Sequence, residues 1–95
     1  MSKGYIIALI TVRDSNRYAG YLRLATEAIE ALGGNVLVRG GKCQALEGEL
    51  PSRTVVIEFS DFETARAFYH SAEYTKARRS REDAADVDIL VVEGI

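Results

Sequence analysis

The chain has 95 residues, the length of one domain, and residues 1–95 are treated as a single unit. Twelve Lys and Arg against fourteen Asp and Glu give a net charge of −2, which offers no general attraction to nucleic acid or to an anionic bilayer. The apolar start is too short for a signal or a membrane span, and a single cysteine excludes an internal disulfide and a multi-cysteine zinc site. These observations predict a cytoplasmic protein without metal or cofactor, whose partner is neither nucleic acid nor membrane.

The first third of the chain predicts a strand followed by a long helix. Residues 5–12 are apolar and largely β-branched, which is the pattern of a strand. From Asp14 the apolar positions recur every three or four residues, which is typical of an amphipathic helix of about five turns. Asp14 or Ser15 can cap the start of this helix, and Gly33-Gly34 can supply the positive φ that ends it.

The middle of the chain predicts two strands joined by a tight turn, and then a buried strand. Residues 35–39 form the first strand, Gly40-Gly41 the hairpin turn, and residues 42–47 the returning strand, because paired glycines tolerate the backbone of primed turns. The run RTVVIEF at residues 53–59 has consecutive aliphatic residues, which indicates burial on both faces. We expect it to be a central strand.

The last third predicts a helix, a further helical segment and a terminal strand. Ser60 and Glu63 form an S-x-x-E capping box at the start of the helix. Ser71 can cap the chain again, so residues 72–82 are expected to form a separate helical segment. Residues 88–93, DILVVE, read as a strand.

This order predicts an α+β fold, the ferredoxin-like βαββαβ sandwich with an extra short hairpin. Its helices would cover one face of the sheet. The first strand nevertheless places aliphatic side chains on both of its faces, and so does the last. Leaving three or four of them in water would forgo about 1.5–3 kcal/mol each, so we expect an obligate homodimer that packs sheet against sheet.

Three segments, GGKCQALEGELPSRTVVIEF, ARAFYHSAEY and ADVDILVVEG, make the chain resemble the domain of unknown function 1330 family, within the dimeric α+β barrel superfamily. The resemblance covers essentially the whole chain. It implies a ferredoxin-like subunit, a dimeric α/β barrel formed through the sheets, and a cavity between sheet and helices where members bind small molecules or do chemistry. It implies no particular reaction. Ala72 stands where the family often has proline, which weakens the expectation of a sharp bend there.

Four residues are candidates for binding a ligand in such a cavity. Tyr18 lies on the apolar stripe of the first helix, while Tyr69 and Tyr74 lie near the expected break in the second. A tyrosine combines an apolar ring with a donor that needs a partner when buried, although core packing explains most such stripes. Arg39, at the end of an apolar strand, could hold a carboxylate through two hydrogen bonds, but a cross-strand or intersubunit ion pair, or simple exposure at the rim, is the favoured interpretation.

Two further residues are weaker candidates for catalysis. His70 is the only histidine and could act as a general acid or base, or as the haem ligand that the superfamily resemblance allows. A solvated histidine near the negative end of a helix dipole is the favoured interpretation. Glu58 interrupts an apolar strand and could serve as a base with a raised pKa, but a cross-strand or intersubunit ion pair is the favoured interpretation.

Three other features are not expected to carry chemistry. Gly40-Gly41 lacks the glycine spacing, lysine and following helix of a phosphate loop. Cys43 is expected on a strand, where a cysteine is usually inert packing. The basic run in residues 76–81 is followed at once by the acidic residues of 82–88, which would screen its field.

Two functions therefore stay open. The first is a dimer that binds a small organic acid or carbonyl compound, with or without a cofactor-independent reaction. The second is a non-catalytic dimerisation or regulatory module whose cavity is filled by its own side chains. An open cavity lined by Arg39 and tyrosines would distinguish them.

Overall fold

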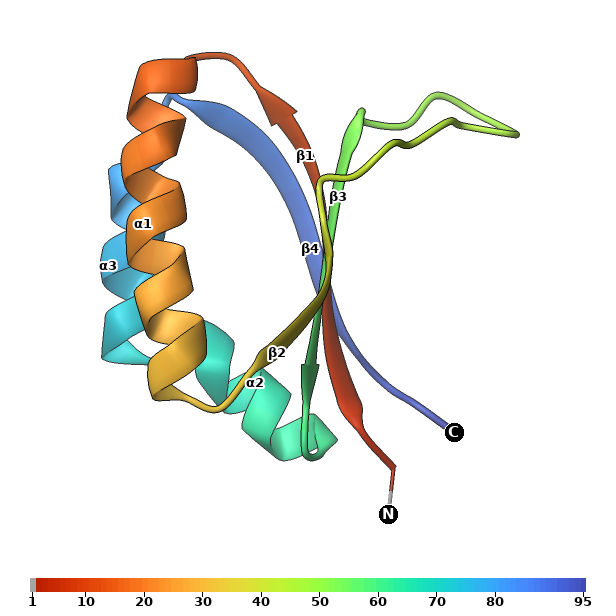
Figure 1. The fold of residues 1–95 in the computed structure, drawn as a ribbon, viewed down its shortest axis with the longest axis vertical. Helices are drawn as coiled ribbons and strands as arrows, with labels where there is room; N and C mark the ends of the chain where they lie inside the picture. The colour runs from red at the N-terminus through yellow and green to blue at the C-terminus, as the bar shows by residue number, and fades with distance from the viewer. Residues whose placement is uncertain (1) are drawn as a thin grey trace.

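The computed structural model describes residues 2–95 as a four-stranded antiparallel sheet with three helices on one face (Figure 1). The elements in chain order are β1 (Gly4–Val12), α1 (Ser15–Ala31), β2 (Asn35–Arg39), β3 (Arg53–Phe59), α2 (Phe62–His70), α3 (Ala72–Ser80) and β4 (Ala85–Glu93). The strands lie in the order β2-β3-β1-β4. The predicted α+β class and βαββαβ order are confirmed. Among residues 2–95, no helix has both the length and the apolar character needed to cross a bilayer.

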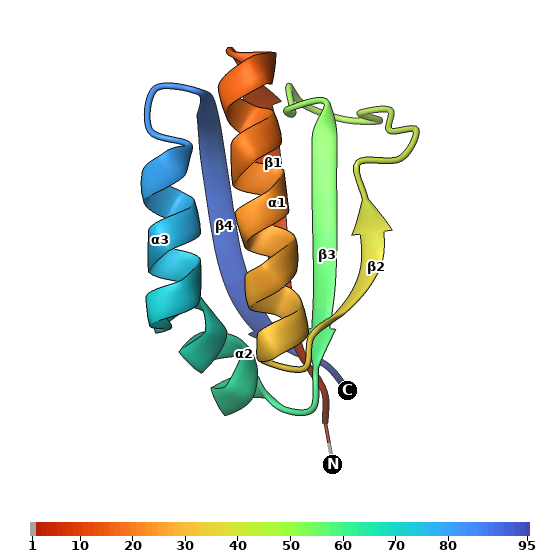
Figure 2. The ribbon, with the colours of Figure 1, turned by 60° about the vertical axis from the view of Figure 1, so that its left-hand side comes forward.

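The two interior strands supply most of the sheet's contribution to the core. In β1 the buried residues alternate with partly exposed ones, and Ile6, Ala8 and Ile10 face the helices. β3 pairs with β1 in a register that places Ile57 opposite Ile6, so Ile57 and Phe59 join the same layer. The prediction that β3 is a central strand is confirmed. Figure 2 shows α1 lying over these two strands, with α3 beside it over β4.

Short side-chain bonds fix the helix ends. The Asp14 side chain accepts from the Arg17 backbone N–H at 3.1 Å and caps α1, as one of the two predicted caps. Ser71 separates α2 from α3 because its backbone is extended, with ψ of 155°. Its hydroxyl donates to the Phe68 carbonyl at 2.7 Å and accepts from the Tyr74 N–H at 3.1 Å. The predicted second cap at Ser71 is confirmed, although α3 ends at Ser80 and not at residue 82.

The predicted extra hairpin is wrong. Residues 40–52 contain no strand, and every residue from 41 to 50 is exposed. The chain turns out of the sheet at Gly40, whose φ is +63°, and β2 pairs with β3 instead of with residues 42–47. Without a second layer to bury alternate side chains, this segment has no reason to stay extended. Cys43 consequently lies in an exposed loop, where its Sγ is 3.8 Å from the Thr54 Oγ1, and not on a strand.

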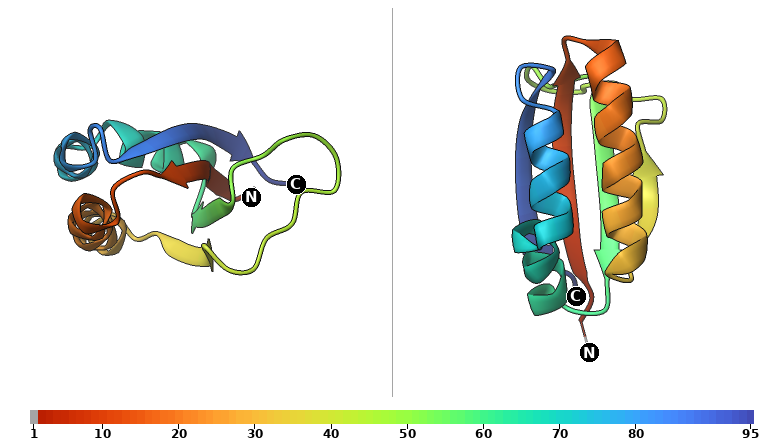
Figure 3. Two further views of the ribbon diagram at one scale, coloured as in Figure 1. Left: turned by 90° about the horizontal axis from the view of Figure 1, so that it is seen from above. Right: turned by 90° about the vertical axis from the view of Figure 1, so that its left-hand side faces the viewer.

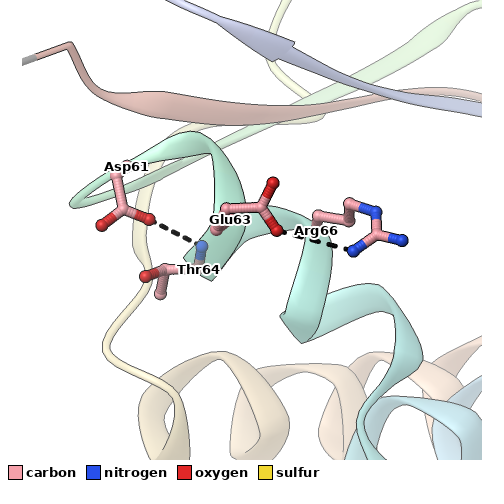
Figure 4. Close-up of polar contacts among 4 residues, drawn as sticks. All are labelled: Asp61, Glu63, Thr64 and Arg66. Atoms are coloured by element: carbon pink, nitrogen blue, oxygen red, sulfur yellow. Dashed lines mark hydrogen bonds and ion pairs between the residues drawn. The ribbon is translucent and has the colours of Figure 1, made fainter.

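Two other predicted boundaries also need correction. Asp61, and not Ser60, caps α2: its carboxylate accepts from the Thr64 N–H at 2.7 Å (Figure 4). The helix begins one residue later than the capping box requires, so Glu63 pairs with Arg66 at 3.5 Å instead of reaching back to the cap. The last strand starts at Ala85, three residues before the predicted start, because its whole length pairs with β1.

The sheet face opposite the helices has no cover within this chain. Figure 3 shows all three helices on the same side of the sheet. The apolar residues on the other side are Tyr5, Ile7 and Leu9 of β1, Val38 of β2, Val56 of β3, and Leu90 and Val92 of β4. Leu90 is 51% exposed and Val92 42%. We call these seven residues the bare face.

The role of Asp61 as the cap of α2 can be tested by substitution. Asp61→Ala should lower the melting temperature by about 3–8 °C, because the Thr64 N–H loses its only capping acceptor. Ser60→Ala should leave it nearly unchanged. The Thr64 bond also lowers the pKa of Asp61, so its stabilising effect is present above the unfolded-state pKa and is lost as pH falls through the folded one. Thermal unfolding of both variants between pH 2 and 7 is the measurement, and equal effects at the two positions would contradict the assignment.

Candidate functional site

A cavity of about 120 Å³ lies between α1 and the helix-facing side of β1 and β3. Tyr74 of α3 and Ile89 of β4 also line it. Most of its wall is aliphatic, from Ile6, Ala8, Ile10, Leu22, Ala25, Ile29, Val55 and Ile57. The polar lining groups are three tyrosines, two arginines and Thr26, whose hydroxyl already donates to the Leu22 carbonyl at 2.8 Å. The cavity is thus apolar with a few polar groups, as small-molecule sites usually are.

Three buried tyrosines connect the helices above this cavity. The hydroxyls of Tyr21 and Tyr74 are 2.7 Å apart and hydrogen-bonded, which joins α1 to α3. The ring of Tyr18 lies one turn before Tyr21, with 5.3 Å between their centroids. Burial, together with the neighbouring Tyr74 hydroxyl, raises the pKa of Tyr21 well above its ordinary value. The Tyr21 phenol is therefore neutral at physiological pH.

Tyr18 and Arg53 bring unpaired donors to the cavity. The Tyr18 hydroxyl and the Arg53 Nε are both buried, and neither has a hydrogen-bond partner among residues 2–95. The Arg53 guanidinium carbon lies 5.6 Å from the centroid of the Tyr18 ring. Burial raises the pKa of Tyr18, and the Arg53 guanidinium partly opposes that rise. A neutral phenol and a cation therefore stand side by side, each able to donate to an anionic oxygen.

Gly40 provides the space that the Arg53 side chain occupies. A Cβ at residue 40 would lie 2.1 Å from the Arg53 Nη1, well inside van der Waals contact. The positive φ of Gly40 is also one that other residues rarely adopt. Its backbone N–H donates to the Thr54 carbonyl at 2.8 Å, which ties the start of the loop to β3. A side chain at residue 40 would therefore require the Arg53 guanidinium to move from this position.

The ionisable groups that line the cavity within residues 2–95 are arginines and tyrosines only. The site can donate hydrogen bonds and stabilise negative charge, but no carboxylate, imidazole, amine or thiol lines it. In the same described part of the chain, no group of three or more His, Cys, Asp and Glu residues is placed to hold a metal ion. The lining is suited to an anion with an apolar body.

The structure brings three of the four predicted ligand-binding residues to one cavity. Tyr18, Tyr74 and Arg39 all line it, with Arg39 exposed at the end of β2. Tyr69 does not line it. Its hydroxyl accepts from the Arg78 Nη1 at 3.0 Å, and the Arg78 guanidinium stacks 4.4 Å from its ring centroid. Tyr69 therefore belongs to the outer side of the helix layer.

The two weaker candidates lie away from the cavity. His70 is exposed at the end of α2, where its ring packs edge-on against Tyr69 at 5.3 Å. His70 and Tyr69 line a separate hollow beside β4. Glu58 pairs with Tyr5 across the sheet and accepts from the Tyr5 hydroxyl at 3.2 Å, on the side away from the helices. A catalytic role for either residue stays a prediction, and neither can reach a ligand held in this cavity.

The sequence matches the family described as Domain of unknown function (DUF1330) over residues 3–95. The chain belongs to this DUF1330 family. The match spans essentially the whole length, so the resemblance noted in the three sequence segments is confirmed. No sequence among the curated proteins matches this DUF1330 chain.

Solved structures share the fold of this DUF1330 chain at low sequence identity. A protein of unknown function from Rhodopseudomonas palustris is 19% identical, with a TM-score of 0.75 over 99% of this chain and 83% of that one. A dimeric ferredoxin-like protein from Thermobifida fusca is 14% identical, with a TM-score of 0.62 over 99% and 92%. A dimeric protein with a ferredoxin-like fold from Bacteroides fragilis is 16% identical, with a TM-score of 0.57 over 96% and 95%. These similarities establish a ferredoxin-like fold.

Sequence reasoning missed Arg53 and did not place Tyr21 in the site. The signal for Arg53 was present, because alternate residues of a strand share a face: Arg53 lies on the same side of β3 as Ile57 and Phe59. A guanidinium on that side of β3 must lie between the sheet and the helices, next to the cavity. Tyr21 follows Tyr18 by three positions and shares the helix stripe. Only the tertiary structure shows that Tyr21 meets Tyr74.

The tyrosine pair generates a prediction. Tyr21→Phe should lower the free energy of unfolding by about 1–3 kcal/mol, because the buried Tyr74 hydroxyl loses its partner. Tyr21→Phe/Tyr74→Phe should cost less than the sum of the two single changes. Tyr5→Phe, on the bare face, is the control and should have a smaller effect. Urea unfolding of the four proteins measures this, and additive effects would contradict a direct Tyr21–Tyr74 interaction.

Proposed function

We propose that this protein is a homodimer in which each subunit binds a small organic acid in the cavity under α1. The observation that carries the proposal is the pair of buried, unpaired donors, the Tyr18 hydroxyl and the Arg53 Nε, at an otherwise aliphatic cavity. Leaving a buried donor without an acceptor costs about 1–3 kcal/mol, and more for a charged group. A carboxylate at this point would satisfy both donors.

The size of the cavity limits the ligand. A cavity of roughly 150 Å³ lined by aliphatic side chains can hold benzene. At about 120 Å³, the cavity suits a body no larger than a benzene ring or a short branched chain. The carboxylate would lie toward Arg53, with the exposed Arg39 at the rim, and the apolar body would lie among the aliphatic side chains. Monocarboxylic acids of this size are the proposed class.

The ionisable lining favours binding over proton abstraction. A neutral tyrosine and an arginine can stabilise charge on a carbonyl oxygen, and such donors assist many reactions of carbonyl compounds. Removing a proton requires a base, and the raised pKa of Tyr21 keeps its phenol protonated near neutral pH. We therefore propose a carboxylate-binding protein, with an oxo acid as a ligand whose carbonyl Tyr18 could polarise.

The bare face is the surface on which we propose that a second copy of the chain packs. Its apolar side chains run across all four strands, and soluble monomers rarely expose such a continuous patch. The loop of residues 40–52 projects on the same side of the sheet (Figures 1 and 3), and its Leu46 is 86% exposed. Two structures with this fold are described as dimeric. A copy packed on this face would cover the patch and lie within reach of the loop, while leaving the helix layer accessible.

Ligand binding can be tested with benzoate. At several times its dissociation constant, benzoate should raise the melting temperature by about 3–8 °C, because it binds only the folded state. Arg53→Gln should abolish most of this shift, and Arg39→Ala should reduce it. Arg23→Gln removes an exposed arginine of α1 that does not line the cavity, and should respond like the wild type. Differential scanning fluorimetry provides the measurement.

Benzamide separates the charge from the shape, because it has the same ring without the anion. It should produce little or no shift. If neither benzoate nor a series of smaller acids such as isobutyrate and 2-oxobutyrate shifts the melting temperature, the proposal fails. The chain would then be better described as a dimerisation module without a ligand.

The proposed dimer makes its own prediction. Leu90→Lys should weaken association by at least about 100-fold, because a charge would be buried in an apolar interface. Ala67→Lys introduces the same charge at an exposed position of α2, on the helix side, and should leave association unchanged. Sedimentation velocity at micromolar concentration measures both. A wild-type monomer at that concentration would refute the dimer.

A further inference from the structure

A polar hollow, separate from the cavity under α1, lies between α3 and the helix-facing side of β4. It has a volume of about 370 Å³ and does not overlap the lining of the cavity except at Ile89. Its polar lining consists of Tyr69, Thr75, Arg78, Arg79, Arg81 and Glu82, and β4 contributes an apolar floor. We call this hollow the arginine groove. Its floor residues Val87 and Ile89 lie on the helix-facing side of β4, opposite to the bare face, so a dimer formed through the sheets would leave it open.

Two of the three arginines are held in place by aromatic rings. The Arg78 guanidinium lies 4.4 Å from the centroid of the Tyr69 ring and donates to its hydroxyl. The Arg81 guanidinium lies 5.3 Å from the centroid of the Tyr21 ring. Stacking on a ring leaves the outer edge of a guanidinium free to donate. The groove therefore presents two preordered cations together with the exposed Arg79.

The groove arginines have no carboxylate partner among residues 2–95, and the hydrogen-bond partners of Arg78 and Arg81 there are tyrosine hydroxyls. The Nε atoms of Arg78 and Arg81 are buried, and across residues 2–95 neither has a hydrogen-bond acceptor. The ion pairs found in the described chain are Arg13 with Asp86 and Arg66 with Glu63, so none involves a groove arginine. Three arginines and one lining carboxylate, Glu82, give the groove a formal charge of +2 (3 − 1) in a chain whose net charge is −2. The cancellation expected from sequence is therefore incomplete at this place.

The geometry of the groups matches a phosphate. Guanidinium groups donate pairs of hydrogen bonds that fit phosphate oxygens, and several arginines around one hollow favour a dianion over a single carboxylate. The hydroxyls of Tyr69 and Thr75 can add neutral donors. The volume leaves room for an organic group over the floor of β4. We propose that the arginine groove binds the phosphate group of a small phosphate monoester.

Inorganic phosphate is the probe for this proposal. Titrating it into the protein at constant ionic strength, with sodium chloride as the balancing salt, should shift the backbone amide NMR signals of residues 75–82 and 87–89. The signals of residues 18–29, which line the α1 side of the cavity, should move much less. Benzoate should give the opposite pattern, so failure of one site can be told from failure of the other. Phosphate shifts spread over all exposed basic residues would overturn the proposal.

Charge-removal variants identify the groove directly. Arg79→Gln removes an exposed charge with little effect on packing and should weaken phosphate binding about fivefold to tenfold. Arg79→Gln/Arg81→Gln should weaken it by at least about 50-fold. Lys76→Gln removes an exposed charge of the same helix outside the groove and should bind phosphate like the wild type. Equal losses in Lys76→Gln and Arg79→Gln would show nonspecific charge attraction and refute the site.

Discussion

The hydrogen bond between the hydroxyls of Tyr21 and Tyr74 joins α1 to α3 through two residues that are 53 positions apart in the sequence. It forms where the rings of both helices meet over the sheet, with Phe68 and Tyr74 also in contact at 4.6 Å between centroids. A buried hydroxyl pair is favourable only if both partners are present, so each helix depends on the other for its position. The depth of the cavity beneath α1 depends in turn on that position. The wide aromatic rings of the helix layer hold α1 above the strands, where the small residues Ala8 and Ala25 leave space.

The sheet divides the molecule into two chemically different sides. On the helix side, the polar groups that line the cavity come from positions that end a strand or lie on a helix, and the ionisable ones are arginines and tyrosines. On the bare face, the polar residues Glu58, Asp88 and Thr54 interrupt the aliphatic side chains. The Glu58 carboxylate accepts a hydrogen bond from the Tyr5 hydroxyl. Within the sheet, the carboxylates of Glu58 and Asp88 lie on the bare face and the guanidinium of Arg53 lies on the helix side. A chain with more acidic than basic residues can therefore still place a cation at a cavity that no carboxylate lines.

The sequence predicted the order of the elements well, because each element carries a local signal. The strands are runs of aliphatic and β-branched residues, α1 has a cap and a glycine end, and Ser71 can bond to its own neighbours in the chain. The errors at the predicted hairpin and at the cap of α2 have one origin. Judged from their sequence neighbours alone, Gly40-Gly41 fits a hairpin turn and Ser60 fits a helix cap. In the structure, β2 pairs with β3 and α2 begins at Phe62. These features depend on contacts that the local sequence does not show.

The candidate site was harder to predict, because its members meet only in three dimensions. Tyr18 and Tyr74 could be proposed from their helix stripes, and Arg39 from its place at a strand end. The direction of the Tyr69 side chain could not be predicted, because it depends on the break at Ser71 between α2 and α3. In the structure Tyr69 contacts Arg78 instead of the cavity. The unpaired state of a donor is also invisible in a sequence. Arg53 looks like an ordinary strand end until its neighbours are known.

The close approach of Gly40 to Arg53 has a consequence for how this chain can vary. A side chain at residue 40 and a guanidinium at residue 53 compete for the same space. Related sequences that keep an arginine at the second position should therefore keep glycine at the first, and a larger residue at 40 should be accompanied by a shorter one at 53. The two positions, thirteen residues apart, are therefore expected to vary together.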